Sequence, residues 1–211
     1  MRKDTTADTE RGQAHTLEGF IGAMVVLMAV LFAVQSVVIT PTTGGAVDRT
    51  VQSQLQTEVQ DALVVADSEG DLSEMVRYWN VTDDEVTFAN ATAPGDGEYT
   101  TDEFQSEWEL GTILGERFGS QGQNYNVRLV SQDGSEPVDL VYQGQPSSSA
   151  FTASYTVTLY EDQHLTAPGN EQYTLEEAAE EASEDGVEGP PIENVGDGPV
   201  YNVVEVRVIV W

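Results

Sequence analysis

One stretch of 21 residues, GFIGAMVVLMAVLFAVQSVVI from Gly19 to Ile39, contains no charged side chain. At a helical rise of about 1.5 Å per residue it would be about 31 Å long, which matches the hydrocarbon core of a bilayer. Its clearly polar side chains, Gln35 and Ser36, lie near its C-terminal end. A charge-free run of this length is rare in the core of a soluble domain, so it predicts a transmembrane helix over residues 19–39.

The basic residues on either side of this run predict its orientation. Before it lie Arg2, Lys3 and Arg11, whereas the first basic residue after it is Arg49. Lys and Arg near a membrane span favour the cytoplasmic side. We therefore expect residues 1–18 to be cytoplasmic and the chain after the span to be extracellular. A cleaved secretory signal is the alternative, but the run is longer than a usual signal core, and residues 40–46 make a poor cleavage site.

The residues directly before the run carry a second pattern. Arg11-Gly12-Gln13-Ala14-His15-Thr16-Leu17-Glu18 places a basic residue, a glycine, a short polar stretch and one glutamate against the apolar run. A glutamate there also favours the positive end of a helix dipole, which is the purely structural interpretation of Glu18. The arrangement resembles the N-terminal signal of type IV pilin-like proteins and of the related archaeal class III signal peptides.

The resemblance, which covers residues 11–40, implies processing and assembly. In those families a prepilin-type membrane peptidase cuts on the cytoplasmic side of the apolar helix, usually next to a glycine, and the glutamate then meets the amino terminus of a neighbouring subunit. The candidate processing and assembly residues are thus Gly12, Gln13, Ala14 and Glu18. If Ala14 is the first residue of the mature chain, Glu18 is its fifth residue, which is the position of the glutamate in those families. The residue before the cut is then Gln13 and not the usual glycine. Glu18 is sixth if the cut follows Gly12.

The remainder of the chain is strongly acidic. From Ala46 to Trp211 there are 33 acidic residues and five arginines, and the one lysine of the chain is Lys3. Such a charge repels itself in dilute buffer and is tolerated where salt shortens the Debye length to about 3 Å. This composition resembles that of proteins of salt-loving archaea. An acidic disordered tail is the alternative, but the apolar, β-branched segments of this region argue against it.

Periodicity predicts an α+β outer domain over residues 48–211, after a linker over 40–47. Apolar residues recur every three or four positions in an amphipathic helix over 48–68 and in helices over 73–79 and 102–118. Apolar and polar residues alternate in four segments, 125–130, 138–142, 150–160 and 201–211. Asp133-Gly134 between the first two indicates a hairpin. We expect an antiparallel sheet of about four strands with helices on one face.

Residues 161–199 are predicted to be an acidic loop insertion between two strands. They contain twelve acidic residues and no basic one, and the glycines and prolines at 186–191 interrupt any helix there. We expect this segment to contribute little to the core, apart from a transient helix over 175–183.

The sequence contains no pattern of an enzyme, a metal site or a cofactor site. Cysteine is absent, and the two histidines, His15 and His164, would lie on opposite sides of the membrane. Neither a GxSxG turn, a GxxxxGK[ST] loop nor a calcium-binding loop occurs. There is no basic stripe for nucleic acid. We expect no catalytic, cofactor-binding or metal-binding residues and no nucleic-acid partner.

Two short motifs are acceptor patterns for N-glycosylation. Asn80-Val81-Thr82 and Asn90-Ala91-Thr92 both fall in the predicted outer domain. Short patterns of this kind also occur by chance, so each is a candidate modification site and no more.

Together these features favour a single-span cell-surface protein that resembles an archaeal type IV pilin-like subunit. Its expected role is structural or adhesive. The bilayer, further copies or other pilin-like subunits would be its partners through the apolar helix. A monomeric anchored binding module is the first alternative, and an anchored hydrolase, disfavoured by the missing motifs, is the second.

Overall fold

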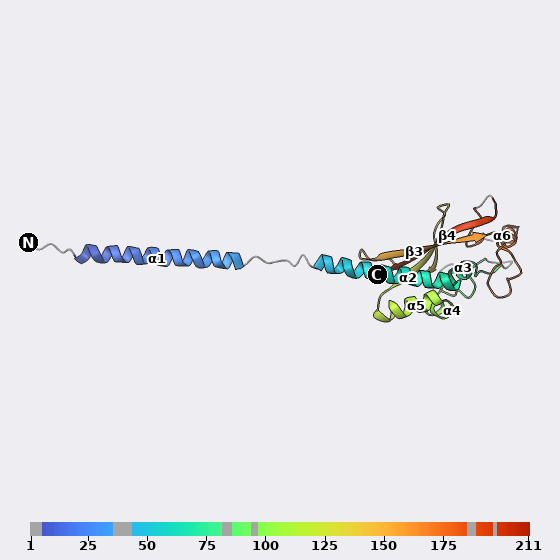
Figure 1. The fold of residues 1–211 in the computed structure, drawn as a ribbon, viewed down its shortest axis with the longest axis horizontal. Coiled ribbons are helices and arrows are strands. Elements are labelled where there is room, and N and C mark those ends of the chain that lie inside the picture. The colour runs from blue at the N-terminus through green and yellow to red at the C-terminus, as the bar shows by residue number, and fades with distance from the viewer. Residues whose placement is uncertain (1–5, 36–43, 82–85, 94–96, 185–188, 196–197) are drawn as a thin grey trace, which may run out of the picture. The chain divides into compact units, whose positions relative to one another are not determined.

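The structure is a computed structural model that describes residues 6–35, 44–81, 86–93, 97–184, 189–195 and 198–211. Side chains are described for residues 17–32 and, within these ranges, from residue 51 onward, with the exception of Ser183 and Glu184. The chain divides into two compact units, Met1–Asp48 and Arg49–Trp211. Figure 1 labels their elements along the chain. Residues 36–39 of the predicted span and 40–43 of the predicted linker lie outside the described residues.

The first unit contains helix α1, Thr6–Gln35. Every side chain described in it, from Leu17 to Phe32, is exposed. Within the residues that the structure describes in full, no helix is both long enough and apolar enough to cross a membrane.

The second unit is an α+β domain built on one antiparallel sheet of four strands in the order β2-β1-β4-β3. The strands are β1 Tyr125–Ser131, β2 Val138–Val141, β3 Phe151–Tyr160 and β4 Val200–Val210. The predicted α+β architecture with a four-stranded antiparallel sheet is confirmed. The predicted hairpin at Asp133-Gly134 is confirmed as well, since β1 and β2 pair antiparallel. Burial alternates along β4, where Val204, Val206, Val208 and Val210 are buried, because neighbouring side chains of a strand point to opposite faces.

Figure 1 shows α2, α4 and α5 on the same side of β3 and β4. Helix α2 runs from Gly44 to Glu69 and therefore begins inside the predicted linker 40–47. Its side chains Val59, Leu63 and Ala66 are fully buried in the core, as the predicted stripe of apolar residues requires. The remaining helices of this unit are α3 Asp71–Val76, α4 Thr101–Glu107, α5 Glu109–Arg117, the 3₁₀ turn η1 Gly119–Gln121 and α6 Leu175–Glu184.

A row of glutamines holds α2 to the free edge of β3. Their side-chain amides donate to carbonyl oxygens at and just before the edge strand: Gln52 to Ser149, Gln56 to Thr152 and Gln60 to Ser154, at 3.2, 2.9 and 3.3 Å. Residues four apart lie on one face of a helix, so this spacing aligns all three amides with the strand. An edge strand otherwise leaves such carbonyls open to pairing with another chain. The glutamines therefore both dock α2 and cover this edge.

The single helix predicted over 102–118 is instead two helices, α4 and α5, which meet at Trp108. The Trp108 backbone is extended there, with φ −121° and ψ 137°. The side chain of Asp71 accepts hydrogen bonds from the backbone N–H groups of Glu109 and Leu110 at 3.2 and 3.1 Å, and so starts a new helix. The break comes from a residue in α3, far away in the sequence.

The expectation that residues 161–199 contribute little to the core was wrong. The segment lies between β3 and β4 and contains α6, and six of its described apolar residues are at most 2 % exposed: Leu165, Ala167, Leu175, Ala178, Ala182 and Ile192. The Arg77 guanidinium fixes the start of the segment by donating to the His164 carbonyl at 2.5 Å. The carboxylates of Glu176, Glu177, Glu180 and Glu181 are exposed on the outer side of α6, because this helix is amphipathic.

Candidate functional site

The candidate processing residues lie on α1. Gly12, Gln13 and Ala14 fall within the helix, but their side chains are outside those described, whereas Glu18 is exposed. The structure thus places all four on one helix. It leaves the cleavage position a prediction.

The surface of α1 is apolar on every side. Eleven large apolar side chains between Leu17 and Phe32 are 51 to 79 % exposed. They occupy consecutive positions such as 24–28, so they cover the whole circumference of the helix rather than one stripe. Transfer of such a surface from water into an apolar environment is favourable.

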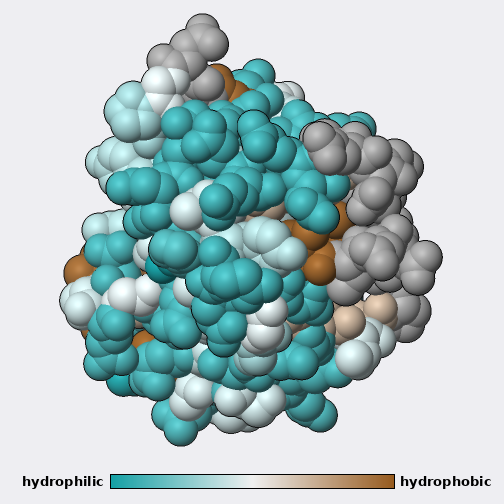
Figure 2. All heavy atoms as spheres, turned by 90° about the vertical axis from the view of Figure 1, so that its right-hand side faces the viewer, coloured by the Kyte–Doolittle hydropathy of each residue, from teal (hydrophilic) through white to brown (hydrophobic). Residues whose placement is uncertain are grey.

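The outer domain contrasts with this helix. The face shown in Figure 2 is dominated by hydrophilic residues, and apolar residues appear only in small separate areas. Its exposed large apolar side chains are scattered, as at Val51, Tyr142 and Val195. Isolated residues of this kind are normal on a monomer surface.

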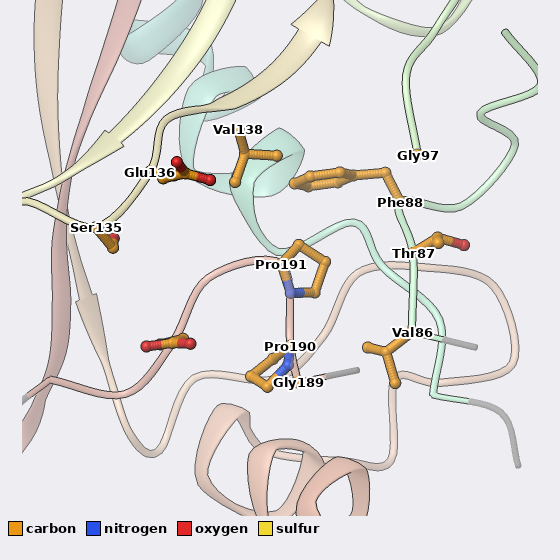
Figure 3. A pocket seen from close by; sticks show the side chains of 11 residues that line it. Val86, Thr87, Phe88, Gly97, Ser135, Glu136, Val138, Gly189, Pro190 and Pro191 are labelled. Atoms are coloured by element: carbon orange, nitrogen blue, oxygen red, sulfur yellow. The ribbon is translucent and has the colours of Figure 1, made fainter. Parts of the chain in front are cut away.

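One hollow of the outer domain, shown in Figure 3, combines apolar walls with carboxylates. Phe88 and Val138 point toward one another above Pro191, and Pro190 lies near Val86. The hollow encloses about 320 Å³. Phe88 and Val86 are nearly buried, at 2 % and 6 % exposure, and they reach it from the segment after α3.

Two carboxylates, Glu136 and Glu193, also line this hollow, and both residues are exposed. Glu136 comes from the β1–β2 hairpin and Glu193 from the segment before β4. An apolar wall beside two carboxylates suits a ligand that is partly apolar and partly cationic. No pattern in the sequence indicates this hollow, because its walls come from segments around 88, 138 and 190 that only the fold brings together.

The two glycosylation acceptor patterns lie in different environments. The side chain of Asn80 is partly buried, and its carbonyl oxygen accepts from the Asn170 amide at 3.1 Å. Its partner Thr82 is outside the described residues. Asn90 is exposed, in a left-handed backbone conformation with φ 61°. Its amide donates to the Tyr78 hydroxyl at 2.9 Å, and Tyr78 donates to Glu107 at 2.7 Å. Asn90 is the more accessible acceptor.

The hydroxyl of Tyr78, which Asn90 contacts, is one of the perturbed groups of this region. Burial, followed by the hydrogen bond to the Glu107 carboxylate, raises the pKa of Tyr78 to about 12. The Tyr78 ring packs edge-on against Trp108 at a centroid distance of 5.0 Å. The hydroxyl therefore remains protonated and structural at neutral pH.

No group of three or more His, Cys, Asp or Glu residues within the described ranges could hold a metal ion. His164, the histidine of the outer domain, directs Nδ1 to the carbonyl of Glu171 at 2.9 Å.

Comparison with known proteins gives a family. A family model matches residues 11–210. The chain belongs to DUF7288, a family of unknown function. The DUF7288 match begins at Arg11, so it includes the segment before the apolar run as well as the outer domain. Neither the curated proteins nor the solved structures gave a match to this chain.

Proposed function

We propose that this DUF7288 protein is a membrane-anchored, pilin-like subunit of the cell surface with a structural or adhesive role. Residues 1–18 would be cytoplasmic, residues 19–39 would span the bilayer, and the acidic outer domain would be extracellular. The observation that carries the proposal is the charge-free run from Gly19 to Ile39, whose described side chains are exposed on α1.

The energetics of α1 support an apolar partner. Burying one large aliphatic or aromatic side chain stabilises a protein by about 1.5–3 kcal/mol. Side chains such as Phe20, Leu27 and Phe32, more than 60 % exposed, gain this only from lipid or from other apolar helices. A helix apolar on all sides can contact lipid on one side and a second copy on the other. Anchoring and lateral association are therefore compatible.

The outer domain supports a display role. The face of this domain in Figure 2 is largely hydrophilic, residues 46–211 carry 33 acidic side chains, and an edge of the sheet is covered by the amides of α2. Such a domain is poorly suited to associate by sheet-edge pairing or by apolar contact. Association would then depend on α1, while the outer domain presents its surface to the medium and tolerates high salt.

A second candidate is a monomeric anchored binding module, in which α1 is only a tether. The hollow formed by Phe88, Val138 and Pro191 favours it, since concave sites with apolar walls are the usual places for ligands. The two candidates differ in one measurable property, the contact between apolar helices of different copies.

Cysteine cross-linking tests that contact. The chain has no cysteine, so Val25→Cys and Met28→Cys each introduce a single reactive group into α1. Oxidation of membranes that carry two differently tagged copies should link them through at least one of these positions. The same variants with Glu18→Gln should reach the membrane equally well but cross-link less, because the carboxylate that meets a neighbour is lost.

Ser147→Cys, in an exposed loop of the outer domain, is the matched control and should not link. Absence of cross-links at both helix positions in the membrane fraction would favour the tether. Equal cross-linking with and without the Glu18→Gln substitution would remove the assembly role of this glutamate.

A further inference from the structure

A second hollow lies where the end of α5 and the turn η1 meet the start of β1, and it is lined by uncharged groups. It encloses about 410 Å³. We call it the amide pocket after its four carboxamide side chains, Gln105, Gln123, Asn124 and Gln143. Its other side chains are hydroxyls, including those of Ser120 and Tyr125, and the remaining lining is glycine. No charged residue lines it, although the chain carries a net charge of −29.

Three of the carboxamides have unused hydrogen-bonding capacity. Within the described part of the chain, the side chains of Gln123, Asn124 and Gln143 form no hydrogen bond, although their backbone groups do. Gln123 and Gln143 donate their backbone N–H groups at 3.1 and 2.8 Å, and Asn124 pairs with Trp211. The backbone is thus fixed while the amides remain available. Each carboxamide offers two donor hydrogens and one acceptor oxygen.

The floor of the pocket contains a buried hydroxyl whose hydrogen bonding is poorly satisfied among the described residues. Tyr125 lines the pocket at 1 % exposure, and no described group forms a hydrogen bond of ordinary geometry with its hydroxyl. Burial raises the pKa of Tyr125, an effect that the nearby but poorly aligned Gln105 side chain partly opposes. Buried polar groups are nearly always hydrogen-bonded, so an unpaired one needs an explanation. A ligand that adds a polar group here would supply the missing partner.

The chemistry of this lining selects the ligand class. An anion finds no cationic group, and a cation finds no carboxylate among the lining side chains. Amides donate and accept in the same way as alcohol hydroxyls, so they match a ligand with several hydroxyls. We infer that the amide pocket binds an uncharged, hydroxyl-rich ligand, namely a neutral sugar.

This site is distinct from the hollow of Figure 3, whose lining includes Glu136 and Glu193. It also has a signal in the sequence. Residues 118–127, FGSQGQNYNV, contain no charge, which is unusual in a chain with 37 acidic residues. The inference does not depend on membrane anchoring or on assembly.

Ligand-observed NMR on the full chain tests it. The protein is kept in molar KCl and in a detergent without a sugar headgroup, because alkyl glycosides would compete for the pocket. The probes are maltose, N-acetylglucosamine and galactose at millimolar concentration, with glucuronate and choline as charged comparisons. Saturation transfer to at least one neutral sugar is expected, and little or none to the charged probes.

Three pocket variants and one control locate the binding. Asn124→Leu and Gln143→Leu each remove one amide, and each should weaken binding by about five- to tenfold, the effect of one net hydrogen bond. Gln132→Leu makes the same change at an exposed position outside the pocket and should leave the affinity unchanged. Tyr125→Phe should weaken binding without lowering the unfolding temperature, because the hydroxyl that it removes forms no hydrogen bond of ordinary geometry with the described residues.

The outcomes separate the explanations. Transfer to no neutral sugar, or equal transfer to glucuronate, would overturn the inference. So would sugar binding that all of the pocket variants leave unchanged. A Tyr125→Phe protein that is clearly less stable would show that its hydroxyl is satisfied within the fold, and the argument from the unpaired group would fail.

Discussion

Replacing Gly111 with alanine tests how α5 packs against α4. A Cβ atom at this position would overlap the Phe104 carbonyl oxygen and lie 2.5 Å from its carbonyl carbon. Both are backbone atoms, so the two helices would have to separate. Gly111 therefore permits a contact between helices that no other residue allows.

The cost follows from two opposing effects. Alanine is favoured over glycine inside a helix by about 1 kcal/mol, whereas overpacking of a tight contact costs about 1–3 kcal/mol and sometimes more. Because the clash is with backbone, we take the upper end of that cost and expect a net loss of about 2 kcal/mol in the free energy of unfolding. For a protein of this size that lowers the unfolding temperature by about 4–8 °C.

Two further glycines of the same region supply controls. A Cβ at Gly115 would meet the end of the flexible Gln105 side chain, which can rotate away, and at Gly119 nothing lies within 4 Å. The expected order of destabilisation is Gly111→Ala, then Gly115→Ala, then Gly119→Ala, which should be neutral or slightly stabilising.

Thermal unfolding followed by tryptophan fluorescence measures this order in the full chain. All three tryptophans, Trp79, Trp108 and Trp211, lie in the second unit, so the signal reports the outer domain alone. An unfolding temperature of Gly111→Ala equal to that of Gly119→Ala would refute the proposed contact between α4 and α5.

Three other predictions use the same signal. The outer domain should unfold at a lower temperature in tens of millimolar salt than in molar salt, because its carboxylates repel one another; equal temperatures would contradict the account of its charge. Gln56→Glu should destabilise it by about 1–3 kcal/mol, since a carboxylate would replace the amide 2.9 Å from the Thr152 carbonyl; an unchanged unfolding temperature would rule out the role of the glutamine row. The free energy of unfolding should fall as pH rises from about 10 to about 12, because the Tyr78 hydroxyl ionises at lower pH in the unfolded chain than in the folded one. Tyr78→Phe should reduce this fall. An identical pH profile in that variant would show that other groups cause it.

The sheet could be predicted from the sequence, because alternation is a local property. Val204, Val206 and Val208 alternate with Glu205 and Arg207, and burial follows that alternation. The amphipathic stripe of α2 was likewise visible in the spacing of Val59 and Leu63. Such patterns identify an element and its buried face without any knowledge of the neighbours.

Other features depend on contacts between distant residues. The break at Trp108 requires the carboxylate of Asp71 in α3, and no glycine or proline marks it. Within 161–199 the apolar spacing of Leu175, Ala178 and Ala182 was present, but the surrounding carboxylates obscured it. Both hollows are assembled from segments far apart in the sequence, so their residues could not be grouped before the fold was known.

The central claim is that the outer domain is extracellular and tethered by α1, and the absence of cysteine permits a direct measurement. His15→Cys and Ser147→Cys place one thiol before the apolar run, after either candidate cleavage position, and one in the outer domain. A membrane-impermeant maleimide on intact cells should label Ser147→Cys, but His15→Cys only after the cells are opened, and both proteins should remain in membranes washed with alkaline carbonate. Labelling of His15→Cys alone on intact cells, or release of both proteins by the wash, would contradict the account.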